Sequence, residues 1–389
     1  MLPEFDNTEI AFKYRSDGDI KRARFLFSSM SSPLLTSVGM AAAKWSINLH
    51  LPVKGIIKKT IFAQFCGGET MEEAAATAAV LDEYGVGVIL DYGVEGKETE
   101  EDFDKAVPEF IKAIRYAASQ KNIPFISLKV TGFAHFNLLA KKHTGVALTN
   151  EESAEWERVF NRINEICKAG AENDIMVLID AEESWIQQPV DDLADAMMEL
   201  YNKEKAIVFN TFQLYRHDRL EFLKISYKVA AEKNYLLGAK LVRGAYMEKE
   251  RKRAAQMGYP SPIQPNKQGT DNDYNEAVIF CLNRLDKLAV FIGTHNEESC
   301  MEAAKFMNDN HIAPNDPHVY FSQLYGMSDN ISFNLAHEGY HVAKYLPYGP
   351  VKDVIPYLMR RAQENTSVAG QTGRELSLIN KELKRRSLK

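Results

Sequence analysis

The sequence predicts an α/β protein whose main body is a closed (βα)8 barrel, and three observations support this. From about residue 56, short apolar runs rich in β-branched and aromatic residues alternate with longer stretches whose apolar residues recur at helical spacing. The strand candidates are continuously apolar, which is typical of parallel strands buried on both faces. About eight such units follow one another without a break in composition, which favours a closed barrel over an open, doubly wound sheet.

The strand candidates number nine, one more than the barrel needs. They are 61–65, 86–92, 124–130, 174–180, 206–213, 238–244, 289–295, 318–324 and 341–347. Either one of them lies outside the barrel or one is not a strand, and the sequence leaves both alternatives open. The alternation is absent before residue 56. Residues 1–55 are therefore predicted to form an N-terminal helical arm, and residues 56–389 the barrel domain.

Local signals predict where individual elements begin and end. Within 67–85, Thr70 followed by Glu73 forms a capping-box pattern, and Gly85 supplies a stop signal for the helix. Residues 258–273 are rich in Pro and Gly and longer than most connections. This segment is therefore a candidate lid or ligand loop.

The composition excludes several classes of protein. The chain has 389 residues and a formal net charge of -6, so no basic excess indicates nucleic-acid binding. Its four cysteines are scattered and form no C-x-x-C pair, which is typical of reduced, intracellular proteins. The acidic N-terminal stretch lacks the features of a secretory signal or transit peptide, and no stretch is long and apolar enough for a membrane span. We therefore expect a cytoplasmic protein.

The C-terminal segment 375–389 is basic and carries Leu376, Ile379 and Leu383 at helical spacing. This pattern predicts a helix. One alternative is that its apolar face docks on the domain, and the other is that it touches an anionic membrane.

The stretch His337-Glu-Gly-Tyr-His341 matches the zinc-protease pattern H-E-x-x-H. In zinc proteases the motif lies inside a continuous helix, whereas here Gly339 stands in its middle and a strand candidate follows. We therefore expect the helix to end at Gly339 and His341 to point elsewhere. A zinc peptidase that uses His337 and His341 stays a remote alternative.

Polar or charged residues lie at the carboxyl ends of most of the predicted strands. They are Lys129, Asp180, Gln213, Lys240, Arg243, Thr294, His295, Asn296 and Tyr345. A single such residue is usually solvated loop, but side chains at the carboxyl ends of most barrel strands predict a functional site there.

The helix after the last strand places Tyr357, Arg360, Arg361 and Glu364 on one face. One interpretation is a surface stripe with an Arg–Glu pair. The other is an anion clamp, in which two guanidinium groups hold a carboxylate by charge-assisted bonds and Tyr345 and Tyr357 wall off a small apolar body. A carboxylate clamp with an apolar wall describes an amino-acid site.

The sequence contains no complete dinucleotide-binding or nucleotide-binding fingerprint. Residues 85–90 contain only the first two glycines of G-x-G-x-x-G and lead into a strand, and no Walker A loop is present. Any dinucleotide must be bound in another way.

The segment YLPYGPVKDVIPYLMRRAQEN resembles the C-terminal signature of the proline dehydrogenase family, flavin enzymes that oxidise L-proline. The resemblance covers roughly residues 57 to 386 and includes FCGGET, SLKVTGFAH, LIDAEES, FNTFQLYRHD, GAKLVRGAYMEKER, GTHNEES and FSQLYGMSD, in that order. The KLVRGAYMEKER form is more similar to the monofunctional, eukaryotic-type branch than to the bifunctional bacterial enzymes.

The resemblance implies a distorted (βα)8 barrel that holds noncovalent FAD at its carboxyl mouth. It implies that the substrate contacts Lys129, Tyr246, Leu324, Tyr345, Tyr357, Arg360 and Arg361. It implies cofactor contacts by Ala181, Gln213, Lys240, Val242, Arg243, Gly244, Ala245, Thr294, His295, Asn296 and Glu364. It further places Glu69 and Glu73 near the mouth, where family members close the site by ion pairing.

The resemblance also implies a reaction and three residues with catalytic roles: Asp180, Lys240 and Tyr345. Hydride passes from the ring carbon next to nitrogen to flavin N5 and yields Δ1-pyrroline-5-carboxylate. Asp180 organises the polar network. A cationic pocket favours the neutral amine, so no strong base is required.

Two positions bear on specificity. The family position facing flavin N5 is often Arg, whereas this chain has Lys240, a point charge instead of a planar fork. Members that prefer hydroxyproline carry a smaller residue where this chain has Tyr345, so we expect proline as the substrate. A hydroxyproline or other cyclic amino-acid dehydrogenase of the same fold is the alternative.

The resemblance implies partners as well. The family usually passes electrons to a membrane quinone, so peripheral contact with the inner face of a respiratory membrane is expected without a span. A pyrroline-5-carboxylate dehydrogenase is a candidate partner for the product.

Overall fold

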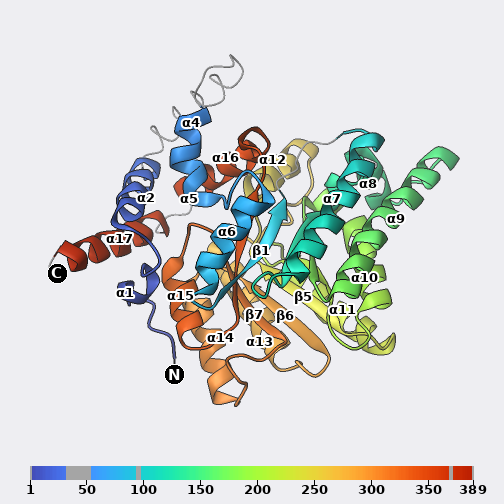
Figure 1. Cartoon of the computed structure of the whole chain (residues 1–389). Coiled ribbons are helices and arrows are strands. Elements are labelled where there is room, and N and C mark those ends of the chain that lie inside the picture. The colour runs from blue at the N-terminus through green and yellow to red at the C-terminus, as the bar shows by residue number, and fades with distance from the viewer. Residues whose placement is uncertain (1, 32–53, 93–97, 368–370, 388–389) are drawn as a thin grey trace. The chain divides into compact units, whose positions relative to one another are not determined.

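The structure is a computed structural model that describes residues 2–31, 54–92, 98–367 and 371–387. Eight parallel strands form a closed barrel in the order β1 to β8 (Figure 1). They are β1 (Val86–Tyr92), β2 (Phe125–Lys129), β3 (Met176–Asp180), β4 (Val208–Gln213), β5 (Leu237–Val242), β6 (Leu288–Gly293), β7 (Val319–Leu324) and β8 (Val342–Tyr348). The predicted (βα)8 barrel and eight of the nine strand candidates are confirmed.

The ninth candidate, residues 61–65, was wrong, because this stretch is helical. Lys58–Phe62 form the π-helix η1, and Ala63–Phe65 form α5. Phe62 and Phe65 stand three residues apart, which places both on one face of the helix, and both are buried. A short apolar run satisfies a strand or a buried helix equally well, so its period could not decide between them.

The helices divide between two compact units. The terminal unit, residues 3–95 and 323–389, contains α1 (Thr8–Ala11), α2 (Asp17–Met30), α4 (Lys54–Ile57), η1, α5, α6 (Met71–Asp82), α15 (Asp329–His337), α16 (Val351–Ser367) and α17 (Gln371–Ser387). The central unit, residues 96–322, contains α7 (Glu100–Ala118), η2 (Val130–Gly132), α8 (Phe136–His143), α9 (Asn150–Asn173), η3 (Ser184–Ile186), α10 (Gln187–Tyr201), α11 (Arg219–Glu232), α12 (Met247–Met257), α13 (Lys267–Leu282) and α14 (Glu297–Asp309).

Each unit has its own ladder of strands. In the terminal unit, β1 pairs with β8 over its whole length, from Val86 beside Val342 to Tyr92 beside Tyr348. In the central unit, the ladders from β2 to β7 continue in chain order. The helices α1 and α2 lie within the predicted N-terminal arm, whereas residues 32–53 fall outside the described residues. The domain boundary at residue 55 stays a prediction.

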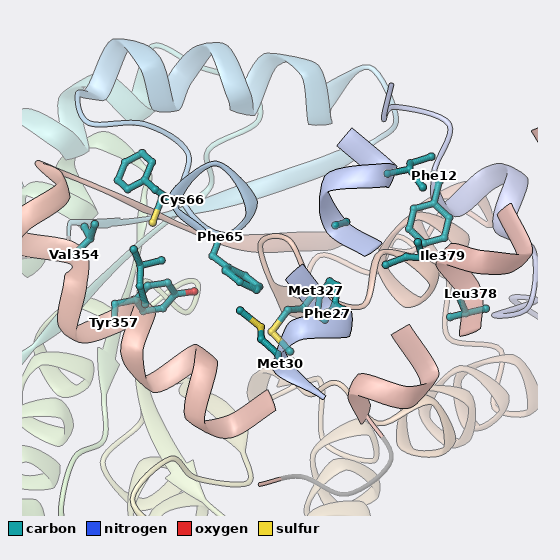
Figure 2. Packing of buried hydrophobic residues seen from close by; sticks show 14 of the residues in the cluster. Phe12, Phe27, Met30, Phe65, Cys66, Met327, Val354, Tyr357, Leu378 and Ile379 are labelled. Carbon is teal, nitrogen blue, oxygen red and sulfur yellow. The ribbon is translucent and has the colours of Figure 1, made fainter. Parts of the chain in front are cut away.

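The terminal unit brings both ends of the chain together. Helix α17 lies beside α2 (Figure 1). Leu378 and Ile379 of α17 are buried in a hydrophobic cluster with Phe12 and Phe27. Figure 2 shows Phe12, Leu378 and Ile379 toward one end of this cluster. This packing agrees with the docked-helix alternative for the C-terminal segment.

A buried ionic network lies in the same unit. Asp329, at the start of α15, accepts a hydrogen bond from Arg15 Nε at 2.8 Å and pairs with Lys344 Nζ of β8 at 2.9 Å. Tyr14 donates to the same carboxylate at 2.8 Å. Burial opposes ionisation of Asp329, but Arg15 and Lys344 hold the pKa of this carboxyl below its usual value. The network therefore links the N-terminal segment to the barrel strand β8.

The HEGYH stretch adopts the predicted helix end. Helix α15 stops at His337, and Gly339 has φ = 84°, the left-handed conformation that glycine tolerates best. The Gly339 N–H donates to the Ala336 carbonyl, and the Tyr340 N–H donates to the Leu335 carbonyl. This is the Schellman pattern of a helix C-terminus. The histidines therefore do not share one helix.

Two local predictions are modified by the structure. Thr70 caps α6 by accepting from the Glu73 N–H, but the Glu73 carboxylate accepts from the Glu69 N–H and not from Thr70. The predicted lid loop is pinned to the segment after β4, because the Gln264 N–H donates to the Tyr215 carbonyl at 2.7 Å. Its last residues, from Lys267 on, already belong to α13.

Candidate functional site

Three charged side chains at or near the carboxyl ends of strands in the central unit form one ionic group. Lys129 ends β2 directly beside Asp180, which ends β3. The Lys240 Nζ of β5 lies 2.6 Å from Asp180 Oδ1, and the Lys129 Nζ lies 3.7 Å from Asp180 Oδ2. The structure therefore brings these three predicted residues together, and their role in a functional site stays a prediction.

Burial gives this group its chemical character. The side chain of Lys240 is 6 % exposed and that of Asp180 is 14 % exposed. A buried cation is tolerated only when it is paired and hydrogen-bonded, and Asp180 supplies that pairing. Two cations and one anion leave an excess of one positive charge, which suits a carboxylate or another anion.

Glu182 lies just beyond this group and was not predicted. Its carboxylate accepts from the Thr131 N–H at 3.1 Å and from the Thr131 hydroxyl at 2.7 Å. Burial raises the pKa of Glu182 to about 7, against the lowering effects of the Thr131 hydrogen bonds and the Lys129 charge. The Gln213 side-chain amide donates to the Glu182 carbonyl at 2.7 Å, so this predicted residue orients the same turn. Ala181, between Asp180 and Glu182, is buried.

Arg243 follows β5 and makes hydrogen bonds with three side chains. Its Nε donates to Asp271 Oδ1 at 2.8 Å, its Nη1 donates to Thr294 Oγ1 at 2.6 Å, and its Nη2 donates to Ser299 Oγ at 2.9 Å. The guanidinium also lies over the Tyr274 ring, 4.3 Å from the centroid. The predicted pair Arg243 and Thr294 is therefore brought together, and Asp271 and Ser299 join it.

The residues after Arg243 form a tight turn. Gly244 has φ = 131°, and a Cβ at this position would lie 2.4 Å from the Tyr215 ring, so only glycine fits. Ala245 is exposed, and the half-buried Tyr246 is the N-cap residue of α12. Val242 accepts a hydrogen bond from the Leu214 N–H, which continues the ladder beyond β4.

The turn after β6 is held by its own polar side chains. The Asn296 side chain accepts from the Ser299 N–H at 3.0 Å and caps α14, while the Asn296 N–H donates to Thr294 Oγ1 at 3.1 Å. His295 lies between Thr294 and Asn296 and is half-buried. The capping bond therefore fixes the Asn296 side chain at the start of α14.

A second group of predicted residues belongs to the terminal unit. Tyr345 of β8 is 8 % exposed and Tyr357 of α16 is 9 % exposed. The Arg361 guanidinium lies over the Tyr357 ring, 5.2 Å from its centroid. Figure 2 shows Tyr357 in the same end of the hydrophobic cluster as Cys66 and Val354. Arg361 is buried, so its position next to an aromatic ring gives the helix face an ordered cation.

The remaining members of this group have simpler surroundings. Leu324, at the end of β7, packs partly buried against the hydrophobic cluster. Arg360 is half-buried. The side chain of Glu364 lies outside the described part of the structure.

The two predicted mouth residues, Glu69 and Glu73, pair with a lysine of η1. The Lys58 Nζ lies 2.8 Å from Glu69 Oε1 and 3.5 Å from Glu73 Oε1. Gly68, just before them, forms a parallel bridge with Tyr348 at the end of β8. This places the FCGGET segment beside the carboxyl end of that strand.

Sequence reasoning missed the partners that hold the site residues in place, chiefly Thr131, Glu182, Asp271 and Glu250. The buried Glu250 accepts from the N–H and the hydroxyl of Ser184 at 2.6 and 2.7 Å, and so fixes the turn after β3. These residues follow no local period. Among them, only Glu182 carries a sequence signal, because it lies two residues after the predicted site residue Asp180.

Within the described ranges, Glu100, His135 and Glu155 are the one trio of potential metal ligands that lie close together. His135 Nδ1 already lies 2.7 Å from Glu155, and Glu100 binds Arg158 and Arg162. The trio is an ion-pair network, and His337 and His341 do not belong to it. The structure therefore gives the zinc-peptidase alternative no support.

A closed (βα)8 barrel with charged and polar side chains at the carboxyl ends of its strands defines the class of barrel enzymes. A family model described as proline dehydrogenase matches residues 74–374. The chain therefore belongs to the proline dehydrogenase family, whose members are oxidoreductases that act on proline and are flavoenzymes.

Several curated relatives agree with this assignment. Proline dehydrogenase 1, mitochondrial, from Dictyostelium discoideum is 33% identical over 87% of this chain and 67% of its own length. The human protein of the same name is 39% identical, over 61% of this chain and 40% of its own length. The carbapenem antibiotics biosynthesis protein CarD from Pectobacterium carotovorum subsp. carotovorum is 36% identical over 83% of each chain.

Solved structures share the fold. Proline utilization A from Bdellovibrio bacteriovorus, inactivated by N-propargylglycine, superposes with a TM-score of 0.73 at 19% identity. The match covers 92% of this chain but only 38% of that longer chain. Among the described residues, no helix is long and apolar enough to cross a membrane.

Proposed function

We propose that this chain oxidises L-proline to Δ1-pyrroline-5-carboxylate with FAD as its cofactor. The observation that carries the proposal is the ionic group Lys129–Asp180–Lys240, placed at the carboxyl ends of three strands. A site with an excess positive charge suits the substrate carboxylate. It also disfavours a second ammonium ion, so it promotes the neutral amine that oxidation requires.

The residues after β4, β5 and β6 fit an anionic dinucleotide. Lys240 and Arg243 supply two cations from one strand and its extension, and both are held in place by carboxylates, Asp180 and Asp271. Gly244 keeps the backbone close to the Tyr215 ring without a side chain. We assign cofactor contacts to Ala181, Gln213, Lys240, Val242, Arg243, Gly244, Ala245, Thr294, His295, Asn296 and Glu364. FAD, when bound, accepts the hydride.

We assign substrate contacts by chemistry as well. Lys129, Arg360 and Arg361 bind the proline carboxylate, since guanidinium groups form bidentate pairs with carboxylates. Tyr345, Tyr357, Leu324 and Tyr246 pack against the pyrrolidine ring. The packing of Tyr357 against the Arg361 guanidinium supports this role, because it orders the cation before any substrate arrives.

The mechanism follows from these roles. Lys129, paired with Asp180, binds the substrate carboxylate in this proposal, so the ring carbon next to nitrogen is held for hydride loss. Asp180 keeps the Lys240 ammonium group at one position through the 2.6 Å contact. With the cofactor bound, the Lys240 ammonium group would supply positive charge toward the hydride acceptor, and Tyr345 would limit the space around the substrate ring.

The electron acceptor and the location are part of the same proposal. We infer that electrons pass to a membrane quinone and that the enzyme works in the cytoplasm, in peripheral contact with the inner face of a respiratory membrane. The product would pass to a separate pyrroline-5-carboxylate dehydrogenase. The fold shared with proline utilization A, a protein described in one solved structure as bifunctional, supports this linkage.

A hydroxyproline or other cyclic amino-acid dehydrogenase is the alternative. CarD, a relative with 36% identity, is named for carbapenem antibiotics biosynthesis and not for proline oxidation, which keeps this alternative open. The visible spectrum of the purified protein decides the matter. A yellow protein that bleaches with L-proline under anaerobic conditions, and less readily with hydroxyproline, is expected. A protein that stays inert after FAD is added overturns the proposal.

A further inference from the structure

The strands β2 and β3 separate immediately after Lys129 and Asp180, the last pair in their ladder. Beyond that point β2 turns into the 3-10 helix η2, and no backbone pairing joins the two described segments. Beyond the ladder, the Glu182 side chain connects the segments that follow β2 and β3. Its carboxylate reaches the N–H and the hydroxyl of Thr131, so a side chain continues the contact where the backbone ladder stops.

The Glu182 residue is itself held at every polar group. Its N–H donates to Gln187 Oε1 at 2.9 Å, and its carbonyl accepts from Gln213 at 2.7 Å. Glu182 is 5 % exposed. A carboxylate that is buried and fixed in this way has one defined position relative to Thr131, and therefore relative to Lys129, two residues earlier.

Lys129 is consequently flanked by two carboxylates. Asp180 Oδ2 lies 3.7 Å from its Nζ, and the Glu182 carboxylate interacts electrostatically with it. The other groups that face Glu182 are its neighbour Glu183 and the neutral side chains of Thr131, Gln187 and Gln213. When Glu182 is ionised, its negative charge weakens the electrostatic attraction of Lys129 for other anions. When Glu182 is protonated, this weakening is absent.

We propose that Glu182 is a positioning residue that fixes the loop carrying Lys129 and sets how much of the Lys129 charge is available to the substrate carboxylate. This inference rests on the proposed function. It adds a residue that acts through Lys129 and does not touch the substrate.

The test is the KM for L-proline of wild type and Glu182→Gln between pH 6 and 8.5. Glutamine keeps the shape of Glu182, still accepts from the Thr131 N–H, and removes the charge. We expect the wild-type KM to exceed the variant KM by at least about threefold at pH 8.5 and to equal it at pH 6, because Glu182 ionises around pH 7. The kcat values of the two proteins stay similar.

Glu250→Gln is the matched control. Glu250 is equally buried and accepts from the backbone N–H and hydroxyl of one residue, Ser184, but does not flank Lys129. We expect the ratio of its KM to the wild-type KM to be independent of pH. A pH-independent ratio for Glu182→Gln, with an active wild-type enzyme, overturns the inference, whereas a wild-type enzyme inactive on proline overturns the proposed function instead.

Thr131→Val provides a second measurement if Glu182→Gln folds poorly. Valine removes the hydroxyl donor and keeps the backbone donor, so Glu182 ionises at higher pH. We expect the rise in KM to move to higher pH by about one unit, and Thr131→Ser to restore the wild-type profile. A profile that Thr131→Val leaves in place contradicts the proposed role of Glu182.

Discussion

Lys344 of β8 and Asp329 of α15 form an ion pair at 2.9 Å, with side chains 0 % and 3 % exposed. Lys344 also donates to the Met327 carbonyl at 2.7 Å. Burial lowers the pKa of Lys344, although Asp329 favours its charged form. The pair therefore holds the strand that carries Tyr345 against the helix that follows β7, within the terminal unit.

Lys344→Met is expected to destabilise the protein by about 3 kcal/mol, because it leaves a buried carboxylate without one of its two cations. The free energy of unfolding from denaturant titration measures this loss. Lys233→Met serves as a control, since Lys233 pairs with Glu199 on the surface and its removal should leave stability close to wild type. A Lys344→Met protein of wild-type stability would show that Arg15 alone satisfies Asp329.

The buried Glu375 of α17 gives the stability a specific pH dependence. Its carboxylate accepts from the Ser328 N–H, and burial raises its pKa to about 7 from 4.5, with Asp329 adding to the rise. The folded protein therefore binds a proton between pH 4.5 and 7 that the unfolded chain releases, so stability falls as the pH rises through this window.

Glu375→Gln is expected to remove this part of the pH dependence. The unfolding free energy of the variant minus that of wild type should therefore be about 3 kcal/mol larger at pH 8 than at pH 4.5. Unfolding free energies of both proteins at pH 4.5, 6, 7 and 8 test this. Glu182 and Asp195 have pKa values raised in the same direction, so the wild-type slope contains their contributions too. The difference between variant and wild type isolates Glu375, and parallel curves would contradict the prediction.

The barrel could be predicted from the sequence because its signal is local and repeated. Continuous apolar runs such as Val86–Tyr92 report their burial directly, and the observed strand matches the predicted one at both ends. The strand prediction for residues 61–65 failed because a mostly apolar run of five residues does not distinguish the strand period from the helical period. The end of α15 at His337 was predicted correctly, since Gly339 is a strong helix stop.

The site was predictable only in part, for a related reason. Lys129 and Asp180 end their strands and Lys240 lies in the second half of β5, so the topology of a parallel barrel brings them together. Their supporting residues obey no such rule. Arg15, Asp329 and Lys344 are far apart in the sequence and meet only through tertiary packing, and nothing local marks any of them as buried.

Lys240 is expected to contribute directly to catalysis. Lys240→Met removes the buried cation and leaves Asp180 with Lys129 alone, so we expect kcat for proline oxidation to fall about 100-fold. Lys240→Arg keeps the charge and the contact with Asp180, and we expect it to retain most of the activity. Lys224→Met, which breaks a pair with Glu276 on α13, is the control and should behave as wild type. Equal kcat in wild type and Lys240→Met would remove Lys240 from the mechanism.

Arg361 should act mainly on substrate binding. Lysine at this position keeps one charge but loses the planar fork and the stacking on Tyr357, so we expect Arg361→Lys to raise the KM for proline about tenfold with a smaller change in kcat. Steady-state kinetics of wild type and Arg361→Lys measure the separate changes in KM and kcat. Arg158→Lys, on an exposed pair with Glu100, should change neither constant. A fall in kcat at unchanged KM would assign Arg361 to another step.

Tyr345 should set the size of the substrate ring. Its side chain is buried in the middle of β8, where Tyr345 pairs with Ile89 of β1 in the ladder. Serine at this position removes the phenol and opens space where a ring hydroxyl would lie. We expect Tyr345→Ser to lower kcat/KM for proline and to raise the ratio of hydroxyproline to proline activity at least about tenfold. An unchanged ratio would show that another residue excludes hydroxyproline, because the space released by Tyr345 would then not be the space that the hydroxyl needs.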